Sequence, residues 1–389
     1  MNTCYKLGDK KKKGEILMKK LIKISMIVLI IFIVILKSIF YKSIKVENYI
    51  KENNSFDLID VNNYDVFLNG ENHTMGKSDK FKLEFFTYLN KKAKVKNIIE
   101  EMGFSSGLLL NEYIQSGNEK YLDSFMNQVN GTMAYTKEKY EFYKFLYEYN
   151  SQLDEDSKIN IYGIDIERNA IDIIKAMEIL IDNNKFVPKS LEKSINLVRE
   201  ENKAAIKLLK LAYEEDKKDC EEYFGDEFIY FENIIKNLYP SGGGEDFRDK
   251  IMMRNFSFVY SINKGEKFFG QFGSEHIYQD YMNSDTLTME EARFAILLNG
   301  ESSPVKNKVY SLLCVYKNEE GNSPSNDFLN YNLFRNIKSD TFIELSGGDS
   351  PFAKKECLFK SGKEENVTCD YIQGLMILKD SQKTHTYNK

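Results

Sequence analysis

The chain has 389 residues, of which 42% are hydrophobic and 29% charged, a balance that is typical of a globular protein and excludes a disordered one. Its formal net charge of -5 and the lack of any nucleic-acid-binding motif in the sequence exclude DNA and RNA as expected partners. The length allows one large domain or two ordinary ones.

The amino end carries a long apolar segment. Residues 24–36 contain no charge, and lysines flank them on both sides. Because lysine stems can reach from the apolar layer to its surface, the usable span extends over residues 21–41, close to the ~20 residues that cross a bilayer. No small-residue cleavage site of the Ala-x-Ala kind follows, which favours an uncleaved transmembrane anchor over a secretory signal peptide.

The distribution of lysines predicts the orientation of this anchor. Residues 1–20 form a basic tail with lysines at positions 10–13, 19 and 20, and the positive-inside rule places such a tail in the cytoplasm. We therefore predict a single-pass protein of the cell membrane. A linker of residues 42–61 would connect the anchor to an extracellular domain of residues 62–389.

Beyond the linker, strand-like and helical patterns alternate. Strands are predicted at Tyr64–Leu68, Val95–Glu100, Lys158–Tyr162, Lys267–Phe272, Lys308–Tyr316 and Asp370–Leu378. Helical periodicity fills the intervals, for example over residues 77–92 and 169–181. Such alternation is typical of an α/β fold with a mostly parallel central sheet flanked by helices.

Two intervals are too long for single crossover helices. Residues 104–152 and 188–239 are rich in aromatic side chains at three- and four-residue spacing, so we expect helical insertions that form a layer over the active edge of the sheet. The glycine-rich run 241–244 lacks the Lys-Ser/Thr of a phosphate-binding loop and is interpreted as a hinge or linker.

Histidine is scarce in this chain, and its placement indicates a site. The three histidines are His73, His276 and His385, the last of them in a polar tail. His73 follows Glu71 at the end of the first predicted strand, and His276 follows Glu275 at the end of the fourth. Ligands of open α/β sheets bind beyond the carboxyl ends of the strands, so the two internal histidines are expected in one site there.

Carboxylates stand at the ends of the second and third predicted strands, at Glu101 and Asp165. A hydrolytic site needs a base that takes a proton from water, carboxylates that hold the base in the right tautomer, and groups that stabilise developing negative charge. Two other interpretations stay open. Asp165 could cap the helix that follows it, and Glu101 could be a first-turn carboxylate favoured by the helix dipole.

The five cysteines offer no clear chemistry. They show neither a Cys-x-x-Cys pair nor a metal-type spacing. Cys357 and Cys369 could form a short disulfide outside the cell, or could be free thiols.

Five motifs, in the order seen here, resemble those of the erythromycin esterase-like family. They span about residues 60 to 380 and are Gly70-Glu71-Asn72-His73, Glu101-Met102-Gly103-Phe104, Tyr162-Gly163-Ile164-Asp165, Arg248-Asp249-Lys250-Ile251-Met252-Met253-Arg254-Asn255 and Gly273-Ser274-Glu275-His276. The first is one residue shorter than the family's Gly-Glu-x-x-His, a spacing also found in the wider superfamily with haem- or iron-binding and Tiki-type protease members. The last lacks the first histidine of the family's His-Asn-x-His.

The resemblance implies roles for five residues. His73 would be the general base on water, with Glu71 and Glu101 orienting and polarising it. His276 would assist near the leaving group, and Arg248 would bind or neutralise developing charge. The substrate would be a small-molecule ester or lactone; no cofactor, no bound metal and no serine nucleophile is expected.

Two hypotheses from other classes stay open. In the first, the protein is a metal-dependent hydrolase or protease in which Glu71, His73, Glu101 and His276 ligate a divalent ion, as their nitrogen and oxygen atoms permit. In the second, it is a non-catalytic surface protein that binds a lipid or glycan in the cleft under its helical layer.

Overall fold

The computed structural model describes residues 18, 20–32, 45–238, 247–282, 291–317, 337–359, 362, 363 and 365–388. The described residues form two compact units, one within Met1–Asn53 and the other within Asn54–Tyr331 and Ile337–Lys389. The second unit contains the whole sheet and is the α/β domain. The predicted hinge at 241–244 and the basic tail up to residue 17 lie outside the described residues.

The first unit contains two helical stretches, at 20–32 and 45–52. The predicted linker is therefore helical over part of its length. No helix in the described part of the chain combines the length and the apolar character that a membrane span needs. Residues 33–41 of the predicted span lie outside that part, so the anchor stays a prediction.

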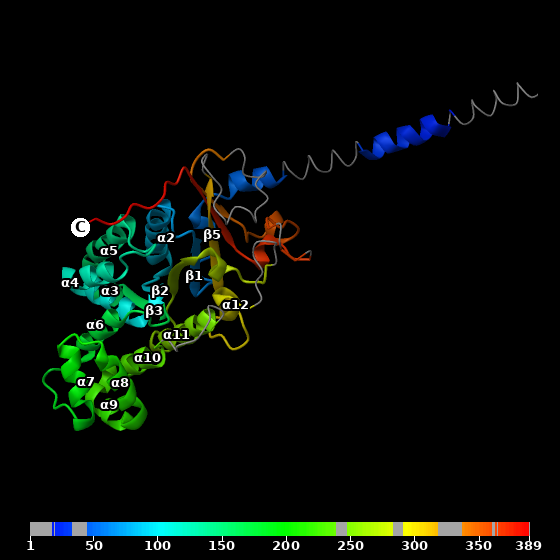
Figure 1. The fold of residues 1–389 in the computed structure, drawn as a ribbon. Coiled ribbons are helices and arrows are strands. Elements are labelled where there is room, and N and C mark those ends of the chain that lie inside the picture. The colour runs from blue at the N-terminus through cyan, green and yellow to red at the C-terminus, as the bar shows by residue number, and fades with distance from the viewer. Residues whose placement is uncertain are drawn as a thin grey trace, which may run out of the picture. The chain divides into compact units, whose positions relative to one another are not determined.

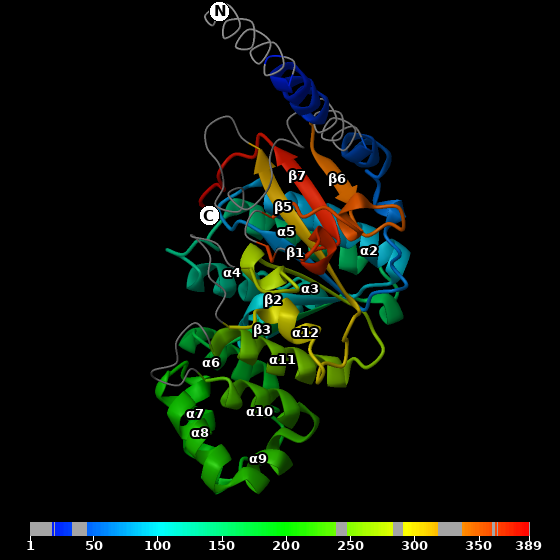
Figure 2. The ribbon, with the colours of Figure 1, turned by 90° about the vertical axis from the view of Figure 1, so that its right-hand side faces the viewer.

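The α/β domain is built on a seven-stranded sheet with the order β3-β2-β4-β1-β5-β7-β6 (Figures 1 and 2). Its strands are β1 Val66–Glu71, β2 Asn97–Gly103, β3 Asn160–Asp165, β4 Phe268–Gly273, β5 Val309–Lys317, β6 Thr341–Glu344 and β7 Gly374–Lys379. Every pairing is parallel except that of β6 with β7. The predicted α/β class and mostly parallel sheet are confirmed, while the antiparallel edge strand β6 was not predicted.

Helices cover both faces of this sheet, as the two perpendicular views show (Figures 1 and 2). Phe85 and Phe86 of α2 contact Phe269 of β4, whereas Phe256 of α11 contacts the adjacent Phe268. Successive strand residues point to opposite faces, so α2 and α11 lie on opposite sides. The helices are α2 Lys77–Ala93, α3 Phe104–Ser116, α4 Glu119–Gln128, α5 Lys137–Ser151, α6 Ala170–Leu180, α7 Lys189–Arg199, α8 Ala204–Glu215, α9 Lys217–Phe224, α10 Phe228–Lys236, α11 Arg248–Ile262 and α12 Phe294–Leu298.

Helix α2 illustrates why these segments fold as they do. Its apolar side chains recur at three- and four-residue spacing and are all buried against the sheet: Phe81, Phe85, Phe86 and Leu89. Each such side chain contributes roughly 1.5–3 kcal/mol on burial. The helix ends at Ala93, and the next residue, Lys94, adopts the left-handed conformation and donates its N–H to carbonyls of the last turn.

The last described residues of the chain pack across two distant segments. Gly76 N–H donates to Gln382 O (2.8 Å), and Thr384 N–H donates to Thr74 O (3.0 Å). Lys137 N–H donates to His385 O (2.9 Å) at the start of α5. Residues 381–388, called the carboxyl clasp below, therefore join the loop that follows β1 to the start of α5.

A close backbone approach fixes α3 on the sheet. A Cβ atom added to Gly107 of α3 would lie 2.1 Å from the amide nitrogen of Gly163 in β3. We expect Gly107→Ala to lower the free energy of unfolding by on the order of 1–3 kcal/mol, because the overpacked helix must move away from the strand. Denaturant unfolding of the purified protein measures this.

Gly348→Ala is the matched control, since nothing lies within 4 Å of the Cβ that it would add. Equal stability of the two variants would contradict the prediction.

Candidate active site

A cavity of about 770 Å³ lies at the carboxyl ends of β1, β2 and β3. Its lining includes Glu71, His73, Glu101 and Arg248, four of the five residues predicted for the site. The fifth, His276, lies directly behind the lining, with its Nε2 atom 3.7 Å from Glu101 Oε1. The structure thus brings all five together at the predicted edge of the sheet.

Strand β1 delivers the first histidine and its carboxylate. The strand ends at Glu71, and His73 follows in the turn before α2. His73 Nδ1 lies 2.9 Å from Glu71 Oε1, and its Nε2 lies 3.9 Å from Glu101 Oε2. The His73 side chain is 39% exposed, so one ring nitrogen is held by a buried carboxylate while the ring reaches the cavity.

The two members of this pair shift each other's pKa. The hydrogen bond to Glu71 raises the pKa of His73 above its ordinary value, while burial opposes the shift and the nearby carboxylate charges add to it. Burial raises the pKa of Glu71, but the hydrogen bond and positive charge of His73 outweigh it and hold that pKa below its ordinary value. Glu71 is therefore ionised at neutral pH.

Glu101 occupies the centre of the site. The pairing of β2 with β3 shifts register between Glu100 and Gly103, and this irregularity in the strand contains Glu101. Arg248 Nη2 donates to Glu101 Oε1 at 2.6 Å, and the Gly273 N–H donates to Oε2 at 2.9 Å. Because Glu101 belongs to β2 and not to a helix, its interpretation as a first-turn carboxylate is wrong.

The charges around Glu101 keep it ionised. Burial raises the pKa of this carboxyl, which is 13% exposed, but the positive charges of His276 and Arg248 lower it to about 2. The carboxylate therefore carries its charge over the whole physiological range.

Arg248 links Glu101 to the end of β3. Its Nε and Nη2 atoms both donate to Asp165 Oδ2, at 2.8 and 2.5 Å. Asp165 does not cap the following helix, because the cap of α6 is Asn169, whose side chain accepts from the Ile171 N–H. The capping interpretation is wrong, and Asp165 is a member of the site that was not among the predicted catalytic residues.

A second histidine–carboxylate pair approaches from the α11 face of the sheet. His276 Nδ1 lies 2.7 Å from Asp249 Oδ1, which also accepts from the Phe294 N–H at 2.7 Å. Burial lowers the pKa of His276, but the hydrogen bond to Asp249 and the charge of Glu101 outweigh it, so that pKa is raised. The sequence placed Asp249 in a motif beside Arg248, yet nothing in the spacing indicated that it would meet His276.

Gly273, the last residue of β4, lies between the two imidazoles. A Cβ atom added there would be 3.2 Å from His73 Nε2 and 3.7 Å from His276 Cδ2. The first distance is tight and the second is ordinary van der Waals contact, so a side chain at this position would press on the His73 ring.

Comparison with known proteins identifies the fold. Neither a protein-family model nor a curated protein sequence matches the chain. Among solved structures, a protein from Bacillus cereus is 15% identical with a TM-score of 0.56, covering 89% of this chain and 99% of its own. A variant of the erythromycin esterase EreC in its open conformation is 11% identical with a TM-score of 0.56, covering 85% and 94%. The chain has the erythromycin esterase-like fold.

A third solved structure, a succinoglycan biosynthesis protein, shares this fold at 14% identity and a TM-score of 0.58, covering 88% of this chain and 98% of its own. The resemblance drawn from the sequence motifs is thereby confirmed at the level of the fold.

The two helical insertions of this erythromycin esterase-like fold contribute unequally to the cavity. The first supplies much of one wall, from Phe125 at the end of α4 through the connecting loop to Lys139 in α5. From the second, the lining includes Lys203. Both predicted insertions are helical, with α3, α4 and α5 in residues 104–152 and α7 to α10 in residues 188–239.

One sequence pattern argues for a serine nucleophile, against the expectation above. Gly103–Gly107 matches Gly-x-Ser-x-Gly and lies between a strand and a helix, as a nucleophile elbow requires. However, Ser105 is fully buried, its N–H donates to Glu167 (2.8 Å), and both site histidines bond to carboxylates instead. None of the described residues with strained positive φ lies in this turn, so the elbow geometry is absent.

The structure also bears on the predicted cysteine pair and on a metal site. Cys357 and Cys369 are both free thiols, so no disulfide joins them. Within the described ranges, no group of three or more His, Cys, Asp or Glu side chains has the arrangement of a metal site.

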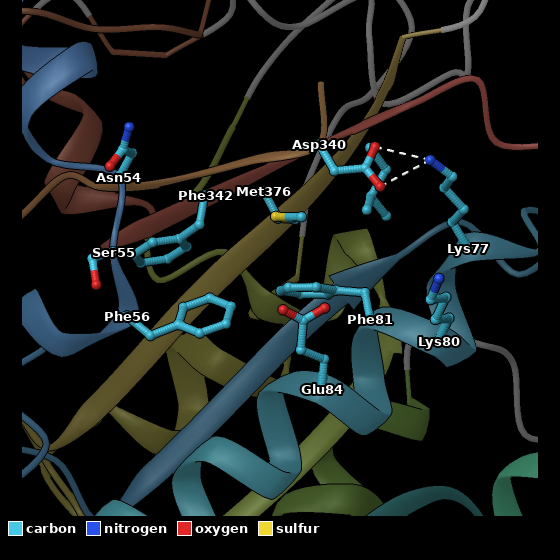
Figure 3. Close-up of a pocket in the computed structure, with 11 residues that line it drawn as sticks. Asn54, Ser55, Phe56, Lys77, Lys80, Phe81, Glu84, Asp340, Phe342 and Met376 are labelled. Carbon is cyan, nitrogen blue, oxygen red and sulfur yellow. Dashed lines mark hydrogen bonds and ion pairs between the residues drawn. The ribbon is translucent and has the colours of Figure 1, made fainter. Parts of the chain in front are cut away.

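A second cavity, of about 380 Å³, lies between α2 and the β6–β7 edge (Figure 3). Phe56, Phe81 and Phe342 form its apolar wall, and Lys77 and Asp340 make an ion pair at its rim (2.8 Å). None of the predicted site residues lines it.

The two histidine pairs can be tested separately by titration. We expect His73 and His276 to titrate above the ordinary value of 6.5. Glu71→Gln should lower the pKa of His73, and Asp249→Asn should lower that of His276, because each removes the charge that favours the imidazolium. NMR titration measures both, with resonances assigned by removing each histidine in turn. An unchanged pKa of His73 in Glu71→Gln would contradict the assignment of that pair.

Proposed function

We propose that the protein is a hydrolase that cleaves an ester or lactone, with His73 as the general base on water. The observation that carries this proposal is the His73–Glu71 pair, in which Glu71 holds Nδ1 while the partly exposed His73 ring lines a large cavity at the end of a parallel sheet. The erythromycin esterase-like fold supports it.

The geometry suits proton transfer from water. With Glu71 accepting from Nδ1–H of His73, the lone pair stands on Nε2, toward Glu101 and the cavity. Nε2 takes a proton from water, and the water oxygen bonds to the carbonyl carbon while the carbonyl electrons move to its oxygen. When the tetrahedral intermediate collapses, the carbon–oxygen bond to the leaving alcohol breaks and the alkoxide receives a proton.

The remaining residues stabilise the charges of this reaction. Glu101 faces the Nε2 atoms of both imidazoles and stabilises the imidazolium that forms on His73. His276, whose pKa is raised, is the proton donor near the leaving oxygen. Arg248, held by Glu101 and Asp165, places a fixed positive charge beside the developing oxyanion.

We further propose that residues 21–41 anchor the protein in the cell membrane with the α/β domain outside. The helix of residues 20–32 exposes a continuous set of apolar side chains, including Leu21, Ile27 and Phe32. Such a surface needs an apolar partner, which a lipid bilayer provides.

Removal of the base should abolish most of the turnover. We expect His73→Ala to lower kcat by on the order of a hundredfold or more. His276→Ala should cost less, because proton donation to the alkoxide is assisted by solvent. Lys193→Ala, at an exposed position of α7 outside the cavity, is the control. In the intact protein, activity should rise with pH through a midpoint above ~6.5, since the neutral imidazole is the base and its pKa is raised.

The rates are measured on a panel of esters and lactones with and without a chelator. Normal turnover in His73→Ala would contradict the assignment of the base. Equal loss in both histidine variants, with stoichiometric bound metal and chelator-sensitive turnover, would instead support the metal-dependent hydrolase.

The orientation can be tested on cells. Protease added to intact cells should degrade the chain beyond residue 42, because that part is proposed to lie outside. Permeabilised cells serve as the control for protease access. Full protection in intact cells without an envelope barrier, followed by degradation after permeabilisation, would contradict the orientation.

A further inference from the structure

The wall of the cavity on the α2 face carries three polar groups whose hydrogen-bonding capacity is unmet. Asp79 of α2 is 7% exposed and its Oδ1 atom has no partner among the described residues. Gln271 of β4 is 4% exposed and its Nε2 atom likewise has none in the described part of the chain. Lys139 of α5 lines the same cavity and forms no ion pair or hydrogen bond through its ammonium with any described residue.

These groups are neighbours around one buried ion pair. Gln271 lies on the same rung of the sheet as Asn69 and Glu100, and side chains on one rung point to the same face. Glu100 accepts from Lys82 Nζ at 2.6 Å. Asp79 lies one helical turn before Lys82, so it faces the same pair.

Lys139 completes the group from α5, which packs beside α2 (Figure 1). Lys139 lines the same cavity as Asp79, Glu100 and Gln271. Burial lowers the pKa of Lys139, but the charges of Asp79 and Glu100 outweigh it and raise that pKa. Asp79, Lys139 and Gln271 therefore converge from a helix, a second helix and a strand.

The donors and acceptors that these three side chains still need indicate the chemistry of a ligand. Asn69 Nδ2 donates to Gln271 Oε1 at 2.7 Å, so the Nε2 of Gln271 is the part of the amide left for another acceptor. Lys139 also requires an acceptor, whereas Asp79 Oδ1 requires a donor. The buried atoms of Asp79 and Gln271 are unfavourable unless a partner satisfies them, whereas Lys139 is only partly buried.

We propose that Asp79, Lys139 and Gln271 form a subsite for a hydroxyl group on the acyl part of the substrate. The hydroxyl oxygen accepts from Lys139 or Gln271, and its hydrogen is donated to Asp79. This inference rests on the proposed hydrolase function.

The charges of the subsite favour a neutral hydroxyl over an ion. An anionic group would face Asp79 and Glu100, and a cationic one would face Lys139 and Lys82.

Glu71, which holds His73, lies two residues after Asn69 in β1 and therefore on the same face of the sheet as Gln271. His276, the proposed donor to the leaving group, bonds to Asp249 of α11 on the other face. The hydroxyl therefore belongs to the acyl side of the scissile bond.

The experiment compares ethyl 3-hydroxybutyrate with ethyl butyrate on the full-length protein. The wild-type kcat/KM should be about tenfold or more higher for the hydroxylated ester, since a site that hydrogen-bonds a hydroxyl discriminates against the analogue without it. Asp79→Asn and Lys139→Met should each abolish this preference, measured within each variant as the ratio of the two kcat/KM values. Lys137→Met, on the exposed side of the same helix, should keep the preference.

Binding measurements with analogues that lack the ester test the subsite independently of hydrolysis. Calorimetry with 3-hydroxybutyramide and butyramide, which share the acyl groups but lack the ester, should show tighter binding of the hydroxylated amide in the wild type and not in Lys139→Met. Selective binding without hydrolysis of any ester would leave the subsite standing and overturn the proposed function. Hydrolysis without any preference for the hydroxylated ester, or a preference that survives both substitutions, would overturn the subsite. If Asp79→Asn fails to fold, the loss or survival of the preference in Lys139→Met decides whether the subsite exists.

Discussion

The structure of the site depends on the burial of one carboxylate, that of Glu101. A charge in so enclosed a position persists only when cations and N–H groups surround it. Its partners come from separate parts of the chain, since Arg248 begins α11, Gly273 ends β4 and His73 follows β1. Each partner can reach Glu101 only if β4 lies between β1 and β2, as the sheet order has it. The strand order of the sheet is thus what allows the Glu101 carboxylate to stay buried and charged.

The two histidine–carboxylate pairs are chemically alike but differ in environment. His73 is 39% exposed and open to the cavity, whereas the His276 side chain is 11% exposed and sits behind the lining. A ring in contact with solvent can exchange its proton directly with water, while the enclosed ring between Asp249 and Glu101 is favoured in its protonated form, which suits the proposed proton donor. The difference in burial, more than any difference in sequence, distinguishes the proposed base from the proposed donor.

The parts of the site that follow directly from strands were predictable from sequence. An apolar run that stops at Glu71 or before His276 predicts both a strand and its carboxyl end. In a parallel sheet these ends lie at one edge. The contact between Asp249 and His276 could not be predicted. Helical periodicity shows on which face of the helix a residue lies, but not which loop packs against that face. The irregular pairing of β2 around Glu101 and the edge strand β6 depend equally on tertiary packing. The second helical insertion shows the same limit, since its aromatic periodicity predicts helices and not where they pack.

The carboxyl clasp has a consequence for the site. Ser381 Oγ accepts from the Lys77 N–H, a contact between residues 304 positions apart in sequence. Together with the bonds to Thr74 and Lys137, it fastens both the His73 loop and the start of the helix that carries Lys139. Ser381 follows the end of β7 at Lys379 by two positions, so the clasp can reach Lys77 once β7 has joined the sheet. The loop that carries His73 and the start of α5 are thereby tied to the last strand of the sheet, and a change in β7 would be felt at the site.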